Sequence, residues 1–314
     1  MNMSASSPST RPLLSLAPLA YYWSKQDTLS FYVDAMQWPV DIVYLGEVIC
    51  SRRHLMKLDD WLSLGKELRA AGKQVVLSSL TLIDSEADRR NMHRMIERAC
   101  AEDFLVEAND FSAVRAMQGK AFVAGPHLNI YHADTLAWLA SLGASRFLPP
   151  IEMGRDDLAS LQLQRTERAL QMQTEVQVWG RLALAFSSRC FTARHHRLRK
   201  DSCEFRCEQY PDGLPLATRD GKDFLTINGI QTQSASCLDL GAQLPELSAM
   251  QVDILRLQPQ AQGMAEVIAA FDSARTMSAG ASVGETLLPS HAQRSNGYWT
   301  NKPGMQWLAG EQIS

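Results

Sequence analysis

The sequence has no long hydrophobic run and no excess of either charge. No stretch of about 18 consecutive apolar residues occurs, so no segment has the length of a membrane-spanning helix. The 31 Lys and Arg residues are balanced by 34 Asp and Glu residues, which leaves a formal net charge of -3. This balance provides no basic field for nucleic acid or for an anionic membrane surface. We therefore expect a cytoplasmic protein that has no transmembrane segment and does not bind nucleic acid.

Common nucleotide-binding and zinc-peptidase motifs are also missing. No Gly-x-Gly-x-x-Gly or Walker-type loop follows an expected strand, which argues against a nucleotide-binding sheet. The zinc-peptidase pattern His-Glu-x-x-His does not occur. In a reducing cytoplasm the six cysteines stay as thiols, so they are candidates for metal ligands or for core positions rather than for disulfides.

Short apolar runs alternate with helical patterns along the chain. Several of the runs are continuous, which is typical of strands buried on both faces. The expected strands are Leu13–Leu16, Ile42–Leu45, Val75–Leu80, Phe104–Val106, Phe122–Ala124, Phe147–Leu148, Val176–Leu184 and Ile254–Leu257. The expected helices are 55–71, 84–101, 132–142, 155–172 and 261–275. About eight alternations favour an α/β fold of the TIM-like (β/α) barrel type, with a doubly wound open sheet as the alternative.

The expected domain organisation is one barrel with additions. Residues 1–10 are expected to be a disordered leader, residues 11–280 the barrel, and residues 281–314 a C-terminal extension packed on it. The strand–helix alternation breaks around 189–240, in the second half of the barrel. That region combines three cysteines, a basic loop and an extra expected strand, Phe224–Ile230. We interpret it as an insertion that elaborates the barrel.

The cysteine spacing predicts a metal centre. Cys203 and Cys207 are separated by three residues, so both thiolates can reach one centre, and the twelve residues between Cys190 and Cys203 can fold back to supply a third ligand. Cys50 is the fourth candidate because it directly follows the expected strand around 41–48, and strand ends converge at the working face of a barrel.

Zinc and an iron–sulfur cluster are both compatible with such a set. Structural zinc sites usually combine two close cysteine pairs, which this chain lacks, so the spacing favours a cluster. The alternative is that the thiols are small core residues. Cys100 is expected to be structural, and Cys237 remains a weaker candidate for the place of Cys50. If four cysteines cap a [4Fe–4S] cluster, no iron is left open to bind substrate, and the Cys-x3-Cys-x2-Cys spacing of radical chemistry is absent.

Five segments, in order along the chain, resemble the peptidase U32 family, and in particular its members that act in oxygen-independent ubiquinone biosynthesis. The resemblance runs from about residue 12 to residue 275 and rests on the following segments: Tyr44–Arg53, Phe104–Ala108, Phe122–Gly125, Ser188–Arg194 and Asn228–Thr232.

The resemblance implies a [4Fe–4S] cluster on Cys50, Cys190, Cys203 and Cys207. It also implies a heterodimer with a UbiU-like protein of the same family. The pair would hydroxylate the ring of a quinone precursor without molecular oxygen, and this chain would be inactive alone. Two alternatives stay open: a U32-type metallopeptidase, which would contain zinc, and a non-enzymatic redox-sensing assembly factor.

Further polar residues occur at expected strand ends, where barrel enzymes place groups that contact substrate. They are Glu47, Glu107, His127, Asn129, Glu152 and Arg256. Arg256 is a candidate for binding a carboxylate, and salt bridges at the barrel rim are the alternative for the whole set. The run Tyr21–Trp23 predicts either an aromatic pocket for a phenolic ring or simple packing. The basic loop 195–200 predicts a solvated face, or a positive field near the cluster.

Overall fold

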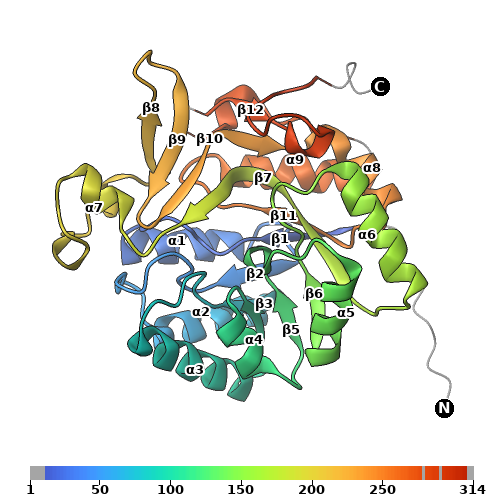
Figure 1. Cartoon of the computed structure of the whole chain (residues 1–314), viewed down its shortest axis with the longest axis horizontal. Coiled ribbons are helices and arrows are strands. Elements are labelled where there is room, and N and C mark those ends of the chain that lie inside the picture. The colour runs from blue at the N-terminus through green and yellow to red at the C-terminus, as the bar shows by residue number, and fades with distance from the viewer. Residues whose placement is uncertain (1–10, 278–279, 290–291, 310–314) are drawn as a thin grey trace.

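Eight parallel strands close into a barrel in the computed structural model, which describes residues 11–277, 280–289 and 292–309. The strands are β1 (Leu13–Leu16), β2 (Ile42–Leu45), β3 (Gln74–Ser78), β4 (Leu105–Ala108), β5 (Phe122–Ala124), β6 (Ala144–Phe147), β7 (Gln173–Phe186) and β11 (Ile254–Leu257). Closure is complete because β11 pairs with both β7 and β1 (Figure 1). The TIM-like barrel is thus confirmed, and the open sheet is excluded.

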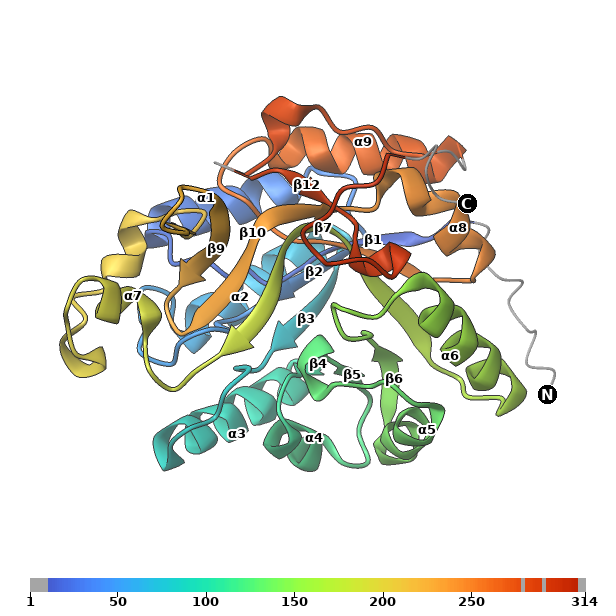
Figure 2. The ribbon, with the colours of Figure 1, turned by 45° about the horizontal axis from the view of Figure 1, so that its top comes forward.

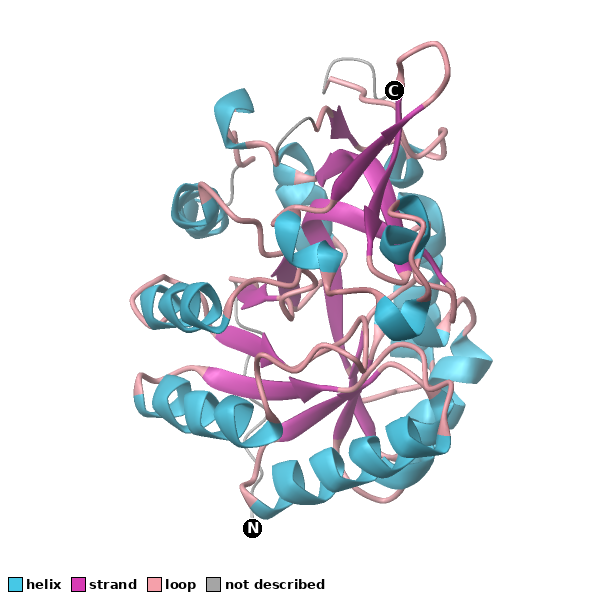
Figure 3. Cartoon of the chain, turned by 90° about the vertical axis from the view of Figure 1, so that its left-hand side faces the viewer, coloured by secondary structure: helices cyan, strands magenta, loops and turns pink. Residues whose placement is uncertain are grey.

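Helices surround this barrel, as the side view in Figure 3 shows. They are α1 (Lys25–Ala35), α2 (Leu58–Ala70), α3 (Glu86–Ala101), α4 (Phe111–Met117), α5 (Ala133–Leu142), α6 (Arg155–Glu167), α8 (Leu244–Ala249) and α9 (Met264–Met277). Local capping sets several boundaries. Ser85 and Asp110 accept backbone N–H groups at the starts of α3 and α4, and Gly143 ends α5 in a left-handed conformation.

Alternation along the strands divides the apolar side chains between two layers. Val43 and Leu45 of β2 join the large core between the barrel wall and the helices, whereas Ile42 and Tyr44 point into the barrel. Strands covered on both faces need apolar residues at successive positions, which is why these runs are continuous in the sequence. The outer layer therefore contributes most of the hydrophobic burial.

The barrel interior contains paired charged side chains as well as apolar ones. The Nη1 atom of Arg256 lies 2.9 Å from Glu107 Oε1 and 3.2 Å from Glu175 Oε1. Arg146 lies 3.5 Å from Glu175, and the Tyr44 hydroxyl donates a hydrogen bond to the same carboxylate. Two cations and two anions balance here, and removing one member of such a buried set usually costs about 3–5 kcal/mol.

The cysteine-bearing insertion is a ribbon of antiparallel strands with a helix at one end. Its elements are α7 (Phe191–His195), β8 (Leu214–Ala217), β9 (Asp223–Asn228) and β10 (Gln231–Asp239). Strand β7 runs on beyond the barrel and pairs with β10, which in turn pairs with β9 (Figure 2). The ribbon covers the barrel at the carboxyl ends of its strands.

The expected single strand Phe224–Ile230 is wrong in its boundaries. The chain leaves β9 after Asn228, turns at Gly229 with φ +62°, and returns as β10. Asn228 pairs with Gln231, so the two-residue turn is Gly229-Ile230, and glycine at its first position supplies the positive φ that such a hairpin turn needs. The hairpin brings Asn228 back toward the barrel and the Cys50 loop.

The C-terminal segment packs on the ribbon and barrel. Strand β12 (Arg294–Ser295) pairs with β10, and Trp299 is 4% exposed and donates a hydrogen bond of 3.1 Å to Glu246. The leader expected over residues 1–10 lies outside the described residues. Within the described ranges, no helix combines the length and apolar character needed to cross a membrane.

Gly46 carries the chain from β2 into the Cys50 loop and tolerates no side chain. Its φ is +123°, and a Cβ atom there would lie 2.7 Å from the backbone oxygen of Ser78. Gly72 also has positive φ, +85°, but nothing lies within 4 Å of its would-be Cβ. We expect Gly72→Ala to lower the free energy of unfolding by about 1 kcal/mol and Gly46→Ala by more than about 2 kcal/mol. Urea denaturation measures both, and equal losses would contradict the steric argument.

Candidate metal centre at the barrel mouth

The side chain of Glu47 stabilises the turn of the loop that follows β2. Glu47 Oε1 accepts hydrogen bonds from the backbone N–H groups of Ile49 at 2.8 Å and Cys50 at 3.0 Å. The N–H of Arg53 then donates to the carbonyl of Cys50 at 3.0 Å. This turn determines where the Cys50 thiol lies at the end of the strand.

Arg53 ties this loop to two others. Its side chain is buried, with Nη1 donating to the carbonyl of Ala20 at 2.7 Å and Nη2 to Asn228 Oδ1 at 2.7 Å. Nη1 also lies 3.4 Å from Glu47 Oε1. Asn228 donates in turn to the carbonyl of Ala20 at 2.8 Å. The ends of β1 and β2 and the β9–β10 hairpin are therefore held around one guanidinium.

Cys190 lies at the N-terminus of α7, which is docked on the same hairpin. Its Sγ atom accepts the N–H of Ala193 at 3.4 Å. Phe191 N–H donates to the carbonyl of Gly229 at 2.8 Å, and Gly229 N–H donates to the Thr192 hydroxyl at 3.0 Å. These bonds fix the direction in which the Cys190 thiol leaves the ribbon.

A sharp bend separates Cys203 from Cys207. Glu204 and Phe205 both have left-handed backbone, with φ of +51° and +50°. The Phe205 ring contacts His54, with centroids 4.6 Å apart. Left-handed conformations are costly for side chains of this kind, so the aromatic packing offsets that cost.

The four thiols lie within electrostatic reach of one another. Burial raises the pKa of the Cys50 thiol, and the Cys207 thiol adds to the rise. Burial also raises the pKa of Cys190, with further contributions from Cys50 and Cys203. The pKa of Cys207 is raised by burial and by Cys190, while the Arg53 guanidinium opposes the rise. All four are partly exposed.

The remaining two cysteines lie elsewhere. Cys237 is completely buried in β10, and burial raises its pKa to about 12. Cys100 packs against the main core from α3. Neither lies in the loops that carry the other four thiols.

The described residues give a hydrolase little support. Among them, no three His, Cys, Asp or Glu side chains could hold a metal ion together, whereas a catalytic zinc site needs three protein ligands and an open position. The serine-hydrolase pattern Gly-x-Ser-x-Gly does occur once, from Gly280 to Gly284. Its serine, Ser282, is exposed and follows helix α9 rather than a strand. A nucleophilic serine in this motif lies on a turn between a strand and a helix, so Ser282 lacks the structural context of a hydrolase nucleophile.

A narrow polar cavity of about 50 Å³ lies between the barrel and the ribbon. Ligand pockets usually measure about 300–1,000 Å³, so this space suits water better than a substrate. Glu107, His127 and Arg256 from the expected set line it. The ribbon and strand ends contribute residues that the sequence did not single out, namely Gln177, Arg181, Gln231, Gln233 and Gln258.

The remaining expected site residues are dispersed. Glu47 lies beside the thiols, whereas Asn129 and Glu152 are exposed on the loops after β5 and β6. Asn129 has φ +55°, and Glu152 accepts a hydrogen bond from Tyr131. Arg256 is already paired with two carboxylates inside the barrel.

The aromatic run Tyr21–Trp23 is used for packing. All three side chains are buried, and the cavity beside them measures only about 20 Å³. Tyr21 donates to Gln233 at 3.2 Å, and Trp23 donates to the carbonyl of Pro211 at 2.7 Å. The structure therefore favours the packing interpretation over a pocket for a phenolic ring.

Part of the basic loop is neutralised by its neighbours. Lys200 of this loop lies 2.9 Å from Asp84. Just outside the loop, Arg52 lies 3.4 Å from Asp201. Arg53, which directly follows Arg52 in sequence, was not among the expected site residues. An Arg-Arg pair two and three residues after a candidate ligand is a signal that could have identified it.

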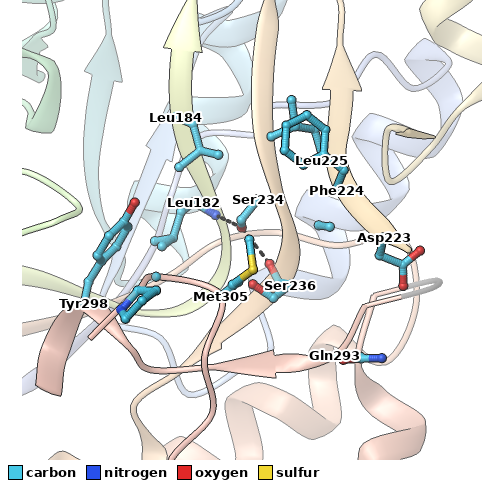
Figure 4. A pocket seen from close by; sticks show the side chains of 13 residues that line it. Leu182, Leu184, Asp223, Phe224, Leu225, Ser234, Ser236, Gln293, Tyr298 and Met305 are labelled. Carbon is cyan, nitrogen blue, oxygen red and sulfur yellow. Dashed lines mark hydrogen bonds between the residues drawn. The ribbon is translucent and has the colours of Figure 1, made fainter. Parts of the chain in front are cut away.

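A separate cavity of about 290 Å³ lies on the other face of the ribbon, beneath the C-terminal segment (Figure 4). Leu182, Phe224 and Met305 line it, and Ser234 is held there by the N–H of Leu182 at 2.9 Å and the carbonyl of Ser236 at 2.6 Å. None of its lining residues comes from the loops that carry the four thiols. This cavity is therefore not part of the candidate metal centre.

The fold and site define a class: a (β/α) barrel whose carboxyl-terminal face bears four cysteines, three of them on an insertion between β7 and β11. The chain belongs to peptidase family U32, whose family model matches residues 28–294. That match covers most of the barrel and the whole insertion.

Three solved structures match this chain at low sequence identity. Ligand-free tryptophan synthase from M. tuberculosis is 11% identical with a TM-score of 0.44, covering 86% of this chain and 91% of that one. The tryptophan synthase alpha chain from Legionella pneumophila is 11% identical with a TM-score of 0.42, covering 86% of each chain. A mandelate racemase/muconate lactonizing protein from Paracoccus denitrificans is 11% identical with a TM-score of 0.39, covering 54% and 48%.

His127 makes stability depend on pH. Burial, followed by the charge of Arg256, lowers its pKa to about 4, whereas an unfolded histidine titrates near pH 6.5. Between these values the unfolded chain binds a proton that the folded chain does not, so stability falls as pH drops through this window. We expect the wild type to lose about 1–3 kcal/mol more than His127→Gln between about pH 7 and about pH 4.5. Urea denaturation at both pH values is the measurement, and parallel losses would count against a depressed pKa.

Proposed function

We propose that this U32 chain is a UbiV-type iron–sulfur subunit that works with a UbiU-like partner of the same family. Together they would hydroxylate the ring of a ubiquinone precursor without molecular oxygen. The motifs around Cys50 and Cys190 resemble that branch of the family. The observation that supports the proposal is that thiols from separate segments act on one another: Cys50 and Cys207 lie near the Arg53 guanidinium, and Cys190 is a neighbour of Cys50, Cys203 and Cys207.

The residues present suit a [4Fe–4S] cluster on Cys50, Cys190, Cys203 and Cys207. Four thiolates are the usual ligands of such a cluster. Its iron atoms occupy separate corners, so its ligands need not converge on one point as zinc ligands must. When bound, the cluster would supply one-electron transfer.

Basic side chains next to the ligands suit an anionic group. Arg53 is buried, and its guanidinium opposes the rise in the pKa of the neighbouring Cys207 thiol. The Nε atoms of Arg52, Arg53 and Arg206 are buried and have no hydrogen-bond partner in the described structure. Each belongs to a residue within three positions of Cys50 or Cys207. Donors without partners are costly in a protein interior, and sulfur atoms at this place would accept from them.

A partner is part of the proposal because the described residues contain no complete set of catalytic groups. The mouth cavity is too small for a ring substrate, and the interior charges are paired with one another. What this chain's own residues would do is hold the cluster, orient it through the Arg53 contacts, and keep water away from one side of it. The second subunit would complete the reaction site.

Single Cys→Ser changes test the cluster. Anaerobically purified wild type should contain about four iron and four sulfide per chain, and changes at Cys50, Cys190, Cys203 or Cys207 should each remove most of both. Cys100→Ser is the matched control, because Cys100 is also a partly exposed thiol but lies outside the cysteine loops. Iron, acid-labile sulfide and zinc are measured on the same samples. One zinc without sulfide would refute the cluster and favour the metallopeptidase.

Complementation tests the reaction. A strain that lacks this gene should lose ubiquinone only when grown without oxygen, and the wild-type gene should restore it. The Cys50→Ser gene should fail under the same conditions, whereas Cys100→Ser should succeed. Ubiquinone is quantified by mass spectrometry, and the folding of both variants is checked by thermal melting. A folded, cluster-free Cys50→Ser protein that still restores ubiquinone would indicate an assembly factor instead.

A further inference from the structure

The segment that carries three of the four cysteines is basic, although the chain as a whole is not. Residues 187–210 contain six Lys or Arg residues and three Asp or Glu residues, a formal charge of +3, whereas the whole chain carries -3. The rest of the chain is therefore acidic. Positive charge is concentrated around Cys190, Cys203 and Cys207 and is not a general property of the surface.

Four arginines of this segment are exposed and have no ion-pair partner among the described residues. We call them the basic face, and they are Arg189, Arg194, Arg197 and Arg199. The other two cations, Lys200 and Arg206, are paired with acidic side chains 2.9 Å and 2.6 Å away. Glu208 is the one acidic residue of the segment that is exposed and has no such pairing in the described structure. Four unpaired guanidinium groups thus face solvent beside one carboxylate, and guanidinium groups bind carboxylates well.

The basic face lies next to the candidate ligands. Helix α7, which carries Arg194, begins directly after Cys190 and lies against the turn that contains Cys207. His196 and the Tyr210 hydroxyl share a hydrogen bond of 3.0 Å, which ties the basic loop to the chain that follows this turn. Figures 1 and 2 both show α7 and the loop after it at the outer edge of the molecule, beyond the barrel. A protein that docks there reaches the cysteine loops without passing the barrel.

The same segment offers little apolar surface. Within the described ranges, the large hydrophobic side chains that are exposed all lie outside residues 187–210. Membrane-surface segments insert such side chains into the lipid, and lasting protein interfaces bury an apolar core. Phe205 packs on His54 and Tyr210 on His196, so neither ring is free to stack on a nucleic-acid base. A charged face of this kind fits a small, transient protein complex held by charge, as electron-transfer proteins form.

We propose that the basic face docks an acidic one-electron carrier protein that exchanges electrons with the cluster. This inference rests on the proposed function, because it takes the cluster as the redox centre. In the reducing direction, one electron leaves the reduced centre of the carrier and is taken up by the cluster, and no atom is transferred. The exposed guanidinium groups bind carboxylates of the carrier and steer its approach. A lasting heterodimer with the UbiU-like partner needs a more apolar surface and uses another face.

Stopped-flow mixing with an acidic plant-type [2Fe–2S] ferredoxin tests the docking. The full chain, purified anaerobically with its cluster, is mixed with the ferredoxin in two experiments, in which either the ferredoxin or the chain is reduced beforehand. One of the two directions is downhill whatever the potential of the cluster. We expect the rate constant in that direction to fall about tenfold or more between about 20 mM and about 200 mM NaCl, because salt screens the attraction. A rate constant that does not depend on salt overturns the proposal.

Neutralising the basic face isolates its contribution. The variant combines Arg194→Gln, Arg197→Gln and Arg199→Gln, and leaves the candidate ligands unchanged. Its rate constant at about 20 mM NaCl should be about tenfold lower than that of the wild type, and most of the salt dependence should be lost. Wild-type rates in a folded variant with full iron and sulfide content contradict the proposal.

A matched control removes the same charge at the other end of the barrel. It combines Arg115→Gln, Lys120→Gln and Arg168→Gln, three exposed cations that lie where α4 and α6 lead into β5 and β7. The net charge of the chain changes by the same amount, but the cysteine loops are not touched. The rate constant and its salt dependence should equal those of the wild type.

A small electron donor distinguishes docking from an effect of the arginines on the cluster itself. Photoreduced 5-deazariboflavin is uncharged and needs no docking face, so it should reduce the wild type and the basic-face variant at equal rates. Equal slowing of both donors in the variant would refute docking. Phosphatidylglycerol vesicles test a membrane in place of a protein. If the three changes abolish vesicle binding but leave the ferredoxin rate unchanged, the basic face contacts a membrane and the proposal is wrong.

Iron and sulfide analysis of the same samples separates this proposal from the proposed function. A chain without iron and sulfide refutes the iron–sulfur assignment, and calorimetric titration with the ferredoxin at about 20 mM NaCl then tests the face by itself. Saturable binding that the three changes weaken supports the face, and absence of binding refutes it. A fully loaded cluster that exchanges no electrons with the ferredoxin in either direction refutes the docking proposal alone.

Discussion

The buried guanidinium of Arg53 is the contact on which the geometry of the cysteine loops depends. A cation removed from water is costly unless its donors find partners, and here the two Nη groups reach the carbonyl of Ala20, the side-chain amide of Asn228 and the carboxylate of Glu47. Those three groups come from the end of β1, the β9–β10 hairpin and the loop after β2. These contacts bring the β9–β10 hairpin, 175 residues away in sequence, to the loop that carries Cys50.

The barrel interior explains why the usual active-site position of this fold is nearly filled. Arg256 and Arg146 pair with Glu107 and Glu175 inside the barrel, and the β7–β10 ribbon covers the mouth. What remains is a narrow polar space. A larger cavity, of about 280 Å³, borders the Cys50 loop outside the barrel wall, between α2 and α3.

The barrel was predictable because strands buried on both faces must be apolar at successive positions. The eight expected strands all occur, with shifted ends such as 173–186 for the run at Val176–Leu184. Helices α1, α4, α7 and α8 were missed. In α1 the buried positions Thr28, Tyr32 and Ala35 are mixed in polarity, while Val33 is half exposed, so the apolar periodicity is weak.

The β10 strand was missed for a different reason. Its sequence is rich in Ser and Ala, and such residues are buried only because the ribbon packs between the barrel and the C-terminal segment. Propensity for strand structure depends on such packing partners. Gly229, a residue type that favours a turn, lies inside the run that was expected to be one strand, so neither the turn nor its second strand was predicted.

The sequence by itself determined the alternation of strands and helices, the barrel class, and the choice of Cys50, Cys190, Cys203 and Cys207 as candidate ligands, because periodicity and spacing are local properties of the chain. Only the tertiary structure decided which polar residues are free to act. It paired Arg256 within the barrel, exposed Asn129 and Glu152, and placed Arg53 among the thiols. Those outcomes depend on which distant charges meet in a space without water, and no short-range pattern in the sequence encodes them.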